Sequence, residues 1–195
     1  DGTGLPNKNK CEELLSEEEP DADTGVCSFD LNNLRRINDS RGHEAGDAYI
    51  RRFAICLRAS IPAEQFVGRA GGDEFLAVTH GLDREQMTQC LEKVRRDMRE
   101  ESKVYPDTPL SYAAGFALAG DFPGSTMREL FNCADKNMYI NKNHVKREEA
   151  AAEKHQGYQL LKLLNQHGSN FSDCLYCDAR MDTYRAIRSS ENFFL

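Results

Sequence analysis

The sequence lacks any excess of positive charge. It has 25 Lys and Arg residues against 32 Asp and Glu, which gives a net charge of −7 at pH 7. Because a long polyanion requires a basic face, this balance argues against a nucleic-acid polymer as a partner. A single nucleotide is still compatible with the composition, since it needs only a local cluster of cations.

Long apolar runs and paired cysteines are also missing. No apolar run approaches the length of a membrane span, and no signal peptide is visible, so we expect a soluble protein without membrane contact in this part of the chain. The cysteines number seven and are scattered, which indicates reduced thiols in a cytosol rather than a disulfide framework. Cys174 and Cys177 have CxxC spacing, but no second pair follows, so zinc is not expected.

What the sequence does contain is an alternation of strand-like and helix-like patterns. Ile50, Phe53, Ala54 and Leu57 repeat on one helical face, in a helix expected to start near residue 47. In chain order, the sequence predicts a helix at 7–19, a strand at 25–31 and the helix that starts near residue 47. Strands at 64–70 and 75–80, a helix around 87–98, a strand at 110–118 and a helix around 127–138 follow. The order β-α-β-β-α-β predicts an α+β fold with a ferredoxin-like core, in which helices flank a mostly antiparallel sheet.

The most distinctive segment lies between the two adjacent strands, where residues 69–75 are RAGGDEF. Consecutive glycines between two strands predict a tight hairpin in which both turn positions can need a positive φ. Asp73 and Glu74 follow directly, where a metal or polar ligand can reach them, and Gly72 leaves room for a bulky anion. A solvated turn is the alternative.

Several blocks together resemble the GGDEF family of diguanylate cyclases. Residues 71–75 match its GGDEF signature; residues 29–39 (FDLNNLRRIND) and 42–47 (GHEAGD) resemble its FDLDxFKxIND…GHxxGD block. Residues 134–142 (ADKNMYINK) resemble its ADxALYxAK helix, and residues 3–8 (TGLPNK) its LTGLPNR segment. The resemblance covers residues 1–147 and implies a nucleotidyl cyclase-like fold.

The resemblance implies a reaction and a metal site. The implied activity joins two GTP molecules into cyclic di-GMP with release of two pyrophosphates, each 3′-hydroxyl attacking the α-phosphorus of the other GTP with the aid of Mg²⁺ or Mn²⁺. Asp30, the Leu31 carbonyl and Asp73 are the implied metal ligands. Glu74 is expected at the site as a supporting ligand or near the 3′-hydroxyl, although successive side chains of a strand point to opposite faces.

The resemblance also assigns the guanine-binding residues, Asn38 and Asp47. An amide and a carboxylate suit guanine, because the carboxylate can accept from N1–H and from the exocyclic amine. An alternative for Asp47 is an N-cap of a helix that begins at Ala48.

Cations and backbone groups are implied to hold the phosphates. Lys142 matches the phosphate-binding Lys of the family, and Arg35 stands where the family usually has Lys. Lys146 stands in for an Arg that touches phosphate, with a solvated surface charge as the alternative, and the backbone N–H groups of Asn32, Asn33 and Leu34 are expected to complete the cradle. Asn32 replaces a usual Asp.

Regulation is expected to depart from the family pattern. Many members carry an RxxD motif that binds product shortly before the hairpin, but the corresponding residues are Pro62 and Gln65. We therefore expect no product inhibition through that site.

The resemblance implies an active enzyme that works as a homodimer. Two alternatives are a weak or inactive GTP-binding signalling domain, and a nucleotidyl cyclase with a mononucleotide product.

The domain prediction places the cyclase domain in residues 1–147. Residues 148–168 are rich in Ala, Glu, Lys and Leu and are expected to form a helical linker. Residues 169–195 end in three apolar residues and are expected to begin a further, sensor-type domain. The family resemblance implies a bacterial cytoplasmic location, in a larger soluble or membrane-attached signalling protein.

Overall fold

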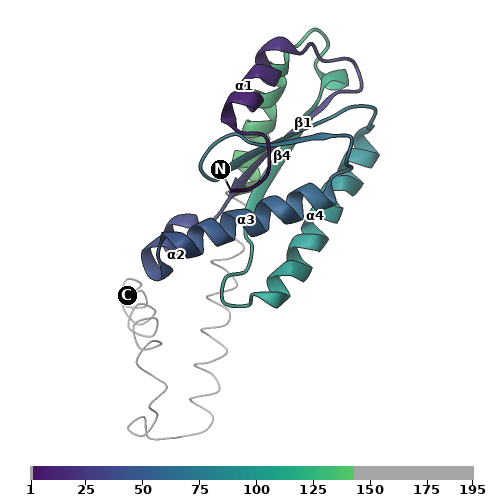
Figure 1. Ribbon diagram of the computed structural model, residues 1–195. Helices are drawn as coiled ribbons and strands as arrows, with labels where there is room; N and C mark the ends of the chain where they lie inside the picture. The colour runs from purple at the N-terminus through teal and green to yellow at the C-terminus, as the bar shows by residue number, and fades with distance from the viewer. Residues whose placement is uncertain (1, 143–195) are drawn as a thin grey trace, which may run out of the picture. The chain divides into compact units, whose positions relative to one another are not determined.

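A computed structural model describes residues 2–142 of the chain. Its elements are α1 (Lys8–Glu17), β1 (Gly25–Leu31), α2 (Leu34–Arg41), α3 (His43–Ser60), β2 (Phe66–Arg69), β3 (Glu74–Thr79), α4 (Arg84–Val104), β4 (Tyr112–Leu118) and the short 3₁₀ helix η1 (Ala119–Asp121) (Figure 1). Residues 127–142 are also helical. The predictions for Lys146, for the linker 148–168 and for residues 169–195 lie outside the described residues.

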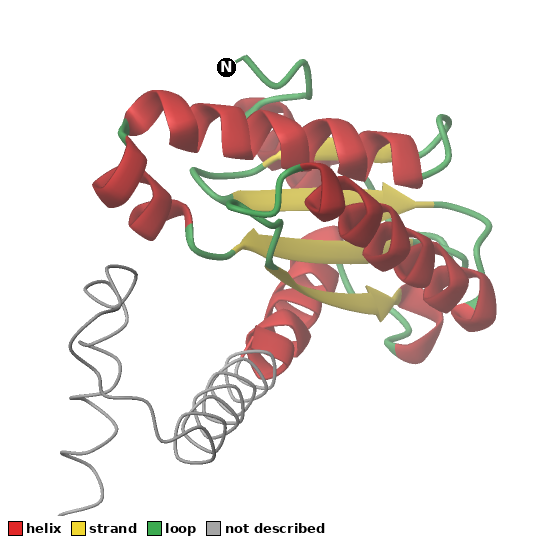
Figure 2. Cartoon of the chain, turned by 90° about the horizontal axis from the view of Figure 1, so that it is seen from below, coloured by secondary structure: helices red, strands yellow, loops and turns green. Residues whose placement is uncertain are grey.

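The four strands form one sheet in the order β2-β3-β1-β4, and all three strand pairs are antiparallel (Figure 2). The crossovers run from β1 through α2 and α3 to β2, and from β3 through α4 to β4. This confirms the predicted ferredoxin-like β-α-β-β-α-β arrangement. None of the helices in residues 2–142 is long and apolar enough to cross a membrane.

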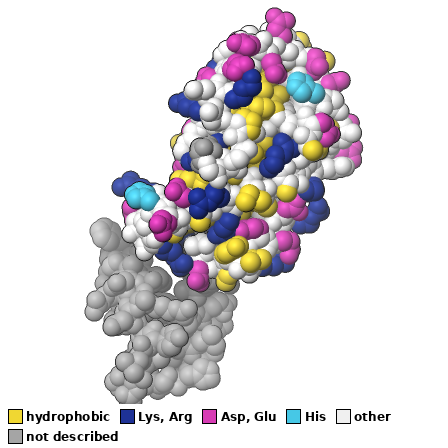
Figure 3. Space-filling model, in the orientation of Figure 1, with side chains coloured by type: hydrophobic (Ala, Val, Ile, Leu, Met, Phe, Trp, Pro, Cys, Tyr) yellow, Lys and Arg dark blue, Asp and Glu magenta, His cyan; other side chains and the backbone are white. Residues whose placement is uncertain are grey.

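Helices cover both faces of the sheet, because alternate strand residues point to opposite sides. On one face, Phe29 and Phe75 pack with the apolar stripes of α3 and α4, around the fully buried Phe53. On the other face, Val26 and Leu76 pack with α1 and with the helix of residues 127–142. Charged side chains of both signs are interspersed over the surface seen in Figure 3, with no continuous basic face on that side.

β1 lies in the middle of the sheet, and every one of its residues is buried except Asp30. A run such as GVCSFDL is typical of a strand covered on both faces, where burial of apolar area stabilises the fold. Asp30 is the exception near the end of this strand, and its carboxylate lies at the boundary between the core and the solvent.

The helix predicted to start near residue 47 begins four residues earlier, at His43, and α2 precedes it. Gly42 separates the two helices and serves as the N-cap of α3, with a φ of 83° that lets the chain turn sharply between them. The alternative role of Asp47 as an N-cap is therefore wrong, since Asp47 lies inside α3.

The hairpin between β2 and β3 is present, but its glycines do not adopt the predicted backbone conformation. Residues 70–73 connect the strands, and the N–H groups of Ala70 and Gly71 both donate to the carbonyl of Glu74. Neither Gly71 nor Gly72 has a positive φ, so this part of the prediction is wrong. The Arg69 guanidinium closes the turn by donating to the Gly71 and Gly72 carbonyls.

Candidate functional site

The end of β1 brings two predicted carboxylates together. Asp30 and Glu74 are direct partners in the antiparallel register of β1 and β3, so their side chains lie on the same face of the sheet. They line a cavity of about 590 Å³ together with residues of the last described helix: Asp135, Lys136, Met138, Tyr139, Ile140 and Lys142. Because successive side chains of a strand alternate between faces, the sequence could not assign Glu74 firmly to the site. The structure places it directly opposite Asp30.

Lys142 supplies the positive charge of this cavity that is nearest to Asp30. Its ammonium donates to the Asp30 carboxylate at 2.7 Å, and the two side chains are 25% and 13% exposed. Lys142 was predicted to bind phosphate, and the structure brings it into contact with a predicted metal ligand.

Asp135 is a site residue that the sequence analysis missed. It precedes Lys142 by seven residues on one helix, which is about two turns, so both side chains lie on the same helix face. Ser28 of β1 donates to the Asp135 carboxylate at 3.3 Å, which fixes this face over the end of the sheet. The sequence signal that could have identified Asp135 is its seven-residue spacing from Lys142 in residues 134–142.

Negative charge accumulates around Glu74. The pKa of Glu74 is raised above its ordinary value, first by burial and then by the neighbouring Asp73, Asp135 and Asp30 carboxylates. Both effects disfavour the ionised form, so this carboxylate is a stronger base than a free one. A cation bound among these groups would relieve their repulsion.

Asp73 lies in the hairpin turn beside this cavity rather than among its lining residues. Its carbonyl accepts from the Leu31 N–H at 2.8 Å, and this bond attaches the turn to the end of β1. Asp73 is close enough to Glu74 to raise its pKa. The hairpin therefore delivers its two acidic residues to the same end of the sheet as Asp30.

The donor set fits a hard divalent cation. Within residues 2–142, no three His, Cys, Asp or Glu side chains converge closely enough to form a ready metal cage. Mg²⁺ rarely uses such a cage, because it is usually bound by one or two carboxylates together with water and the phosphates of a substrate. Asp30, Asp73 and the Leu31 carbonyl offer oxygen donors of this kind.

The predicted guanine-binding residues meet where α2 packs against α3. A Cβ added to Gly46 would lie only 1.9 Å from the Asn38 side-chain oxygen, so the amide rests directly against the backbone of α3. Asp47 is the next residue along and is exposed. Only glycine permits this approach, and the approach brings the Asn38 amide close to the residue preceding Asp47.

The connection between β1 and α2 has unusual backbone and side-chain features. Asn33 is the N-cap of α2 and has a φ of 65°, the only positive φ among the described non-glycine residues. The backbone N–H of Asn32 donates to the Ser111 carbonyl at 2.8 Å, so the prediction that this N–H binds phosphate is wrong. The Asn32 side chain is 7% exposed; its amide donates to the Ser111 hydroxyl at 3.2 Å, and its oxygen is buried without a hydrogen-bond partner within the described residues. Leu34 packs partly against the core.

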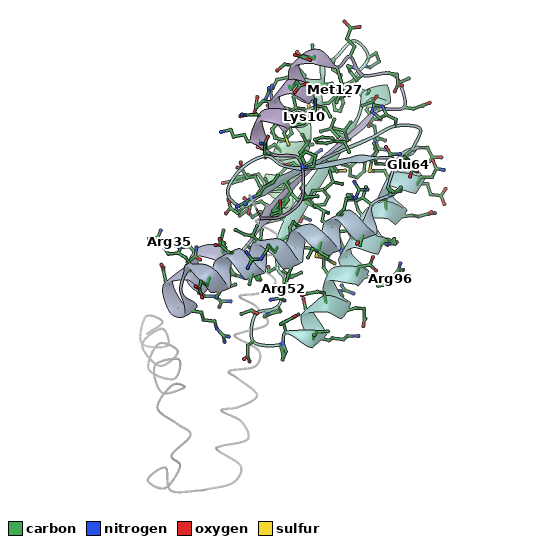
Figure 4. The ribbon with its side chains drawn as sticks, in the orientation of Figure 1. Lys10, Arg35, Arg52, Glu64, Arg96 and Met127 are labelled. Atoms are coloured by element: carbon green, nitrogen blue, oxygen red, sulfur yellow. The ribbon has the colours of Figure 1, made fainter. Side chains whose placement is uncertain are left out.

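Arg35 is not brought to the carboxylates. Its side chain is 95% exposed and projects from α2 (Figure 4), and its one ion pair within residues 2–142 is with Asp39 at 3.8 Å. A single flexible exposed pair of this kind contributes little to stability, so Arg35 is free to reorient.

Pro62 and Gln65, which occupy the positions of the product-binding motif, take part in structural contacts. Gln65 is 7% exposed and forms two hydrogen bonds with the backbone of His80, donating at 3.1 Å and accepting at 2.8 Å. Arg58 donates to the carbonyls of Pro62 and Gln65. These side chains tie the α3–β2 turn to the end of β3.

Known proteins with sequences similar to this chain point to one family. The family model "Diguanylate cyclase, GGDEF domain" matches residues 1–148. Cyclic di-GMP phosphodiesterase PdeR of Escherichia coli (strain K12) is 28% identical over 144 residues, which cover 72% of this chain and 22% of that protein. The chain therefore spans less than a quarter of this curated relative.

Solved structures share the fold. The GGDEF domain of DgcB from Caulobacter crescentus, in complex with c-di-GMP, superimposes with a TM-score of 0.63 at 22% identity, covering 74% of this chain and 89% of that one. A microbial GGDEF domain studied for its interaction with cyclic di-GMP gives a TM-score of 0.60 at 28% identity, covering 73% and 91%.

Proposed function

The chain belongs to the GGDEF domain family of diguanylate cyclases, and we propose that it condenses two GTP molecules into cyclic di-GMP. In each half of the reaction a 3′-oxygen forms a bond to the α-phosphorus of the other GTP. The bond from that phosphorus to the bridging oxygen breaks, pyrophosphate leaves, and the hydroxyl proton passes to a base. The observation that carries this proposal is the pairing of Asp30 with Glu74 beneath Lys142 at the open end of β1.

The carboxylates divide the work at the reacting end of the nucleotide. Asp30, Asp73 and the Leu31 carbonyl would hold Mg²⁺ or Mn²⁺, which would neutralise phosphate charge and activate the attacking oxygen. Glu74 supports this set and is placed near the attacking 3′-hydroxyl, whose proton its carboxylate can accept.

Phosphate binding falls to cations and backbone groups around the same end of the sheet. Lys142 neutralises the charge that develops on the phosphates, and the exposed Arg35 can swing toward them from α2. The N–H groups of Asn33 and Leu34 and the open backbone at Gly72 complete the cradle, with Lys146 as a further proposed contact.

Guanine is selected by Asn38 and Asp47. The Asp47 carboxylate accepts from N1–H and from the exocyclic amine, and the Asn38 amide, seated on Gly46, bonds the base edge. Adenine has an acceptor at N1 and would leave the carboxylate unpaired, which favours guanine. This preference for guanine argues against a mixed cyclic dinucleotide that contains adenine.

The reaction requires two copies of the domain. Each copy holds one GTP, so a homodimer with facing sites is the proposed active unit. We place the protein in the bacterial cytoplasm or attached to a membrane from that side, with sensor domains in the same chain. Product inhibition through the usual motif is not expected, because Gln65 is committed to His80 and neither Pro62 nor Gln65 offers a charge.

The test is incubation of the concentrated protein with GTP and Mg²⁺ or Mn²⁺, with products resolved by mass spectrometry. Cyclic di-GMP is expected from the wild type and from the control Asp107→Ala, which removes a 78% exposed carboxylate. None is expected from Asp73→Ala or Asp30→Ala. Turnover by Asp30→Ala equal to that of the wild type would refute the site.

The similarity to a cyclic di-GMP phosphodiesterase favours a second candidate, a domain that binds GTP and regulates without turnover. GTP binding with no cyclic product, even when two copies are fused to a dimerising coiled coil, would establish this alternative. A mononucleotide product in the same assay would instead identify a different cyclase.

A further inference from the structure

The Lys142 ammonium occupies the Asp30 carboxylate that the proposed function assigns to a metal ion. The contact is 2.7 Å long and largely shielded, since the two side chains are only 25% and 13% exposed. At such a site a charge-assisted hydrogen bond is stronger than a surface pair, because water competes for it less.

The surrounding charges explain why a cation rests there. Asp30 faces Glu74 across the strand pair, and Asp135 lines the same cavity. Carboxylates so close together repel one another, and an ammonium among them neutralises part of that repulsion. The same arrangement creates a competition, since Lys142 and a metal ion would both bind the Asp30 carboxylate.

The helix that carries Lys142 is fastened to the sheet. Asn137 donates to the Phe116 carbonyl of β4 at 2.9 Å, and one turn later Asn141 accepts from the Ala114 N–H at 3.4 Å. Gly115 lies between these residues, and a Cβ added there would come within 2.1 Å of the Met138 backbone nitrogen. The helix backbone is therefore fixed against β4, and Lys142 can change partners only by rotation of its flexible side chain.

We infer that Lys142 is an internal cation that a divalent metal ion must displace from Asp30, and that its displacement makes the ammonium available to the triphosphate. The inference rests on the proposed function and adds a sequence of contacts at the same site, in which Lys142 leaves Asp30 when the metal binds and then contacts the triphosphate. Metal binding without nucleotide must break the Lys142–Asp30 pair and leaves the ammonium without a phosphate partner. With nucleotide present, the released ammonium gains a phosphate partner.

Metal and nucleotide are therefore expected to bind with positive coupling. Because coupling is reciprocal at equilibrium, the metal raises nucleotide affinity by the same factor as the nucleotide raises metal affinity. Lys142 is the source of this coupling, so its removal is expected to tighten the binding of metal alone while weakening the cooperation between the two ligands.

The experiment measures Mn²⁺ binding to the full chain by the electron paramagnetic resonance of free Mn²⁺, with and without a non-hydrolysable GTP analogue. Without nucleotide, Lys142→Met is expected to bind Mn²⁺ about tenfold more tightly than the wild type, since a half-buried ion pair no longer competes. Lys142→Arg keeps the competing charge and is expected to bind Mn²⁺ as weakly as the wild type.

Lys136→Met is the matched control, because it removes the same charge from another lysine lining the same cavity. An equal gain in Mn²⁺ affinity for Lys136→Met and Lys142→Met would overturn the inference, since general electrostatics would then account for it. Undiminished coupling between Mn²⁺ and the analogue in Lys142→Met would overturn it as well. The proposed function fails separately if neither the wild type nor any of these variants binds Mn²⁺ with nucleotide, or if the wild type makes no cyclic di-GMP.

Discussion

Replacement of Gly46 by alanine separates the stability of the fold from recognition of the base. The added methyl group would lie 1.9 Å from the Asn38 side-chain oxygen, far inside van der Waals contact. The obstacle is a side chain and not backbone, and Asn38 is only partly buried, so the amide is expected to rotate away while α2 and α3 stay in place.

The energies involved nearly cancel in stability but not in binding. Alanine in place of glycine inside a helix gains about 1 kcal/mol, while crowding at a packed contact costs about 1–3 kcal/mol before relaxation. With Asn38 rotated outward, we expect the free energy of unfolding to stay within about 1 kcal/mol of the wild type. GTP affinity is expected to fall about tenfold or more, because the displaced amide no longer meets the base.

The assay combines urea denaturation with titration of a non-hydrolysable GTP analogue and its adenine counterpart. The variant Asn38→Ala is the control, and the double variant closes the cycle. In the Asn38→Ala background the new methyl group has nothing to displace, so it should add about 1 kcal/mol of stability and leave affinity unchanged. If Gly46→Ala alone bound the guanine analogue as tightly as the wild type, the placement of Asn38 in the base site would be refuted.

Three further predictions concern the frame that holds the site. Gly115→Ala is expected to cost about 3 kcal/mol or more in urea denaturation, because the new methyl would meet helix backbone that cannot rotate away; a variant as stable as the wild type would contradict this close packing. Arg52→Lys is expected to lose about 1–2 kcal/mol, since lysine cannot reproduce the two-pronged bond to the half-buried Glu101; the control Glu101→Gln should lose a similar amount. The pKa of the Asp97 carboxyl is lowered, first by its hydrogen bond from Lys93, so its contribution to stability is present above its ordinary pKa and is lost as the pH falls through the lowered value. Asp97→Asn should therefore be slightly less stable than the wild type at pH 7, by at most about 1 kcal/mol, with the gap closing below about pH 4 in denaturation curves; a gap that widened in acid would contradict the assignment.

Much of the fold followed from local patterns. Strand β1 was predicted with the bounds that the structure shows, because a central strand buried on both faces is a short apolar run. The helical repeat of Ile50, Phe53, Ala54 and Leu57 identified α3, since those residues face the core. The start of α3 was misplaced because residues 43–46, its first turn, show no apolar repeat. α2 was missed because it is only eight residues long and buries a single side chain, Ile37.

The sequence by itself determined the family, the order of elements and the types of residue in the site, because motifs and periodicity are properties of adjacent positions. It could not determine which acidic residue faces Asp30, because that depends on the register between β1 and β3, residues far apart in the chain. Nor could it show that Lys142 rests on Asp30, that Asp135 joins the same cavity, or that Asn38 seats on Gly46. The first two contacts are set by how a helix packs on the sheet, and the third by how α2 packs on α3. A shift of one residue in the strand register would likewise turn Glu74 to the opposite face of the sheet from Asp30.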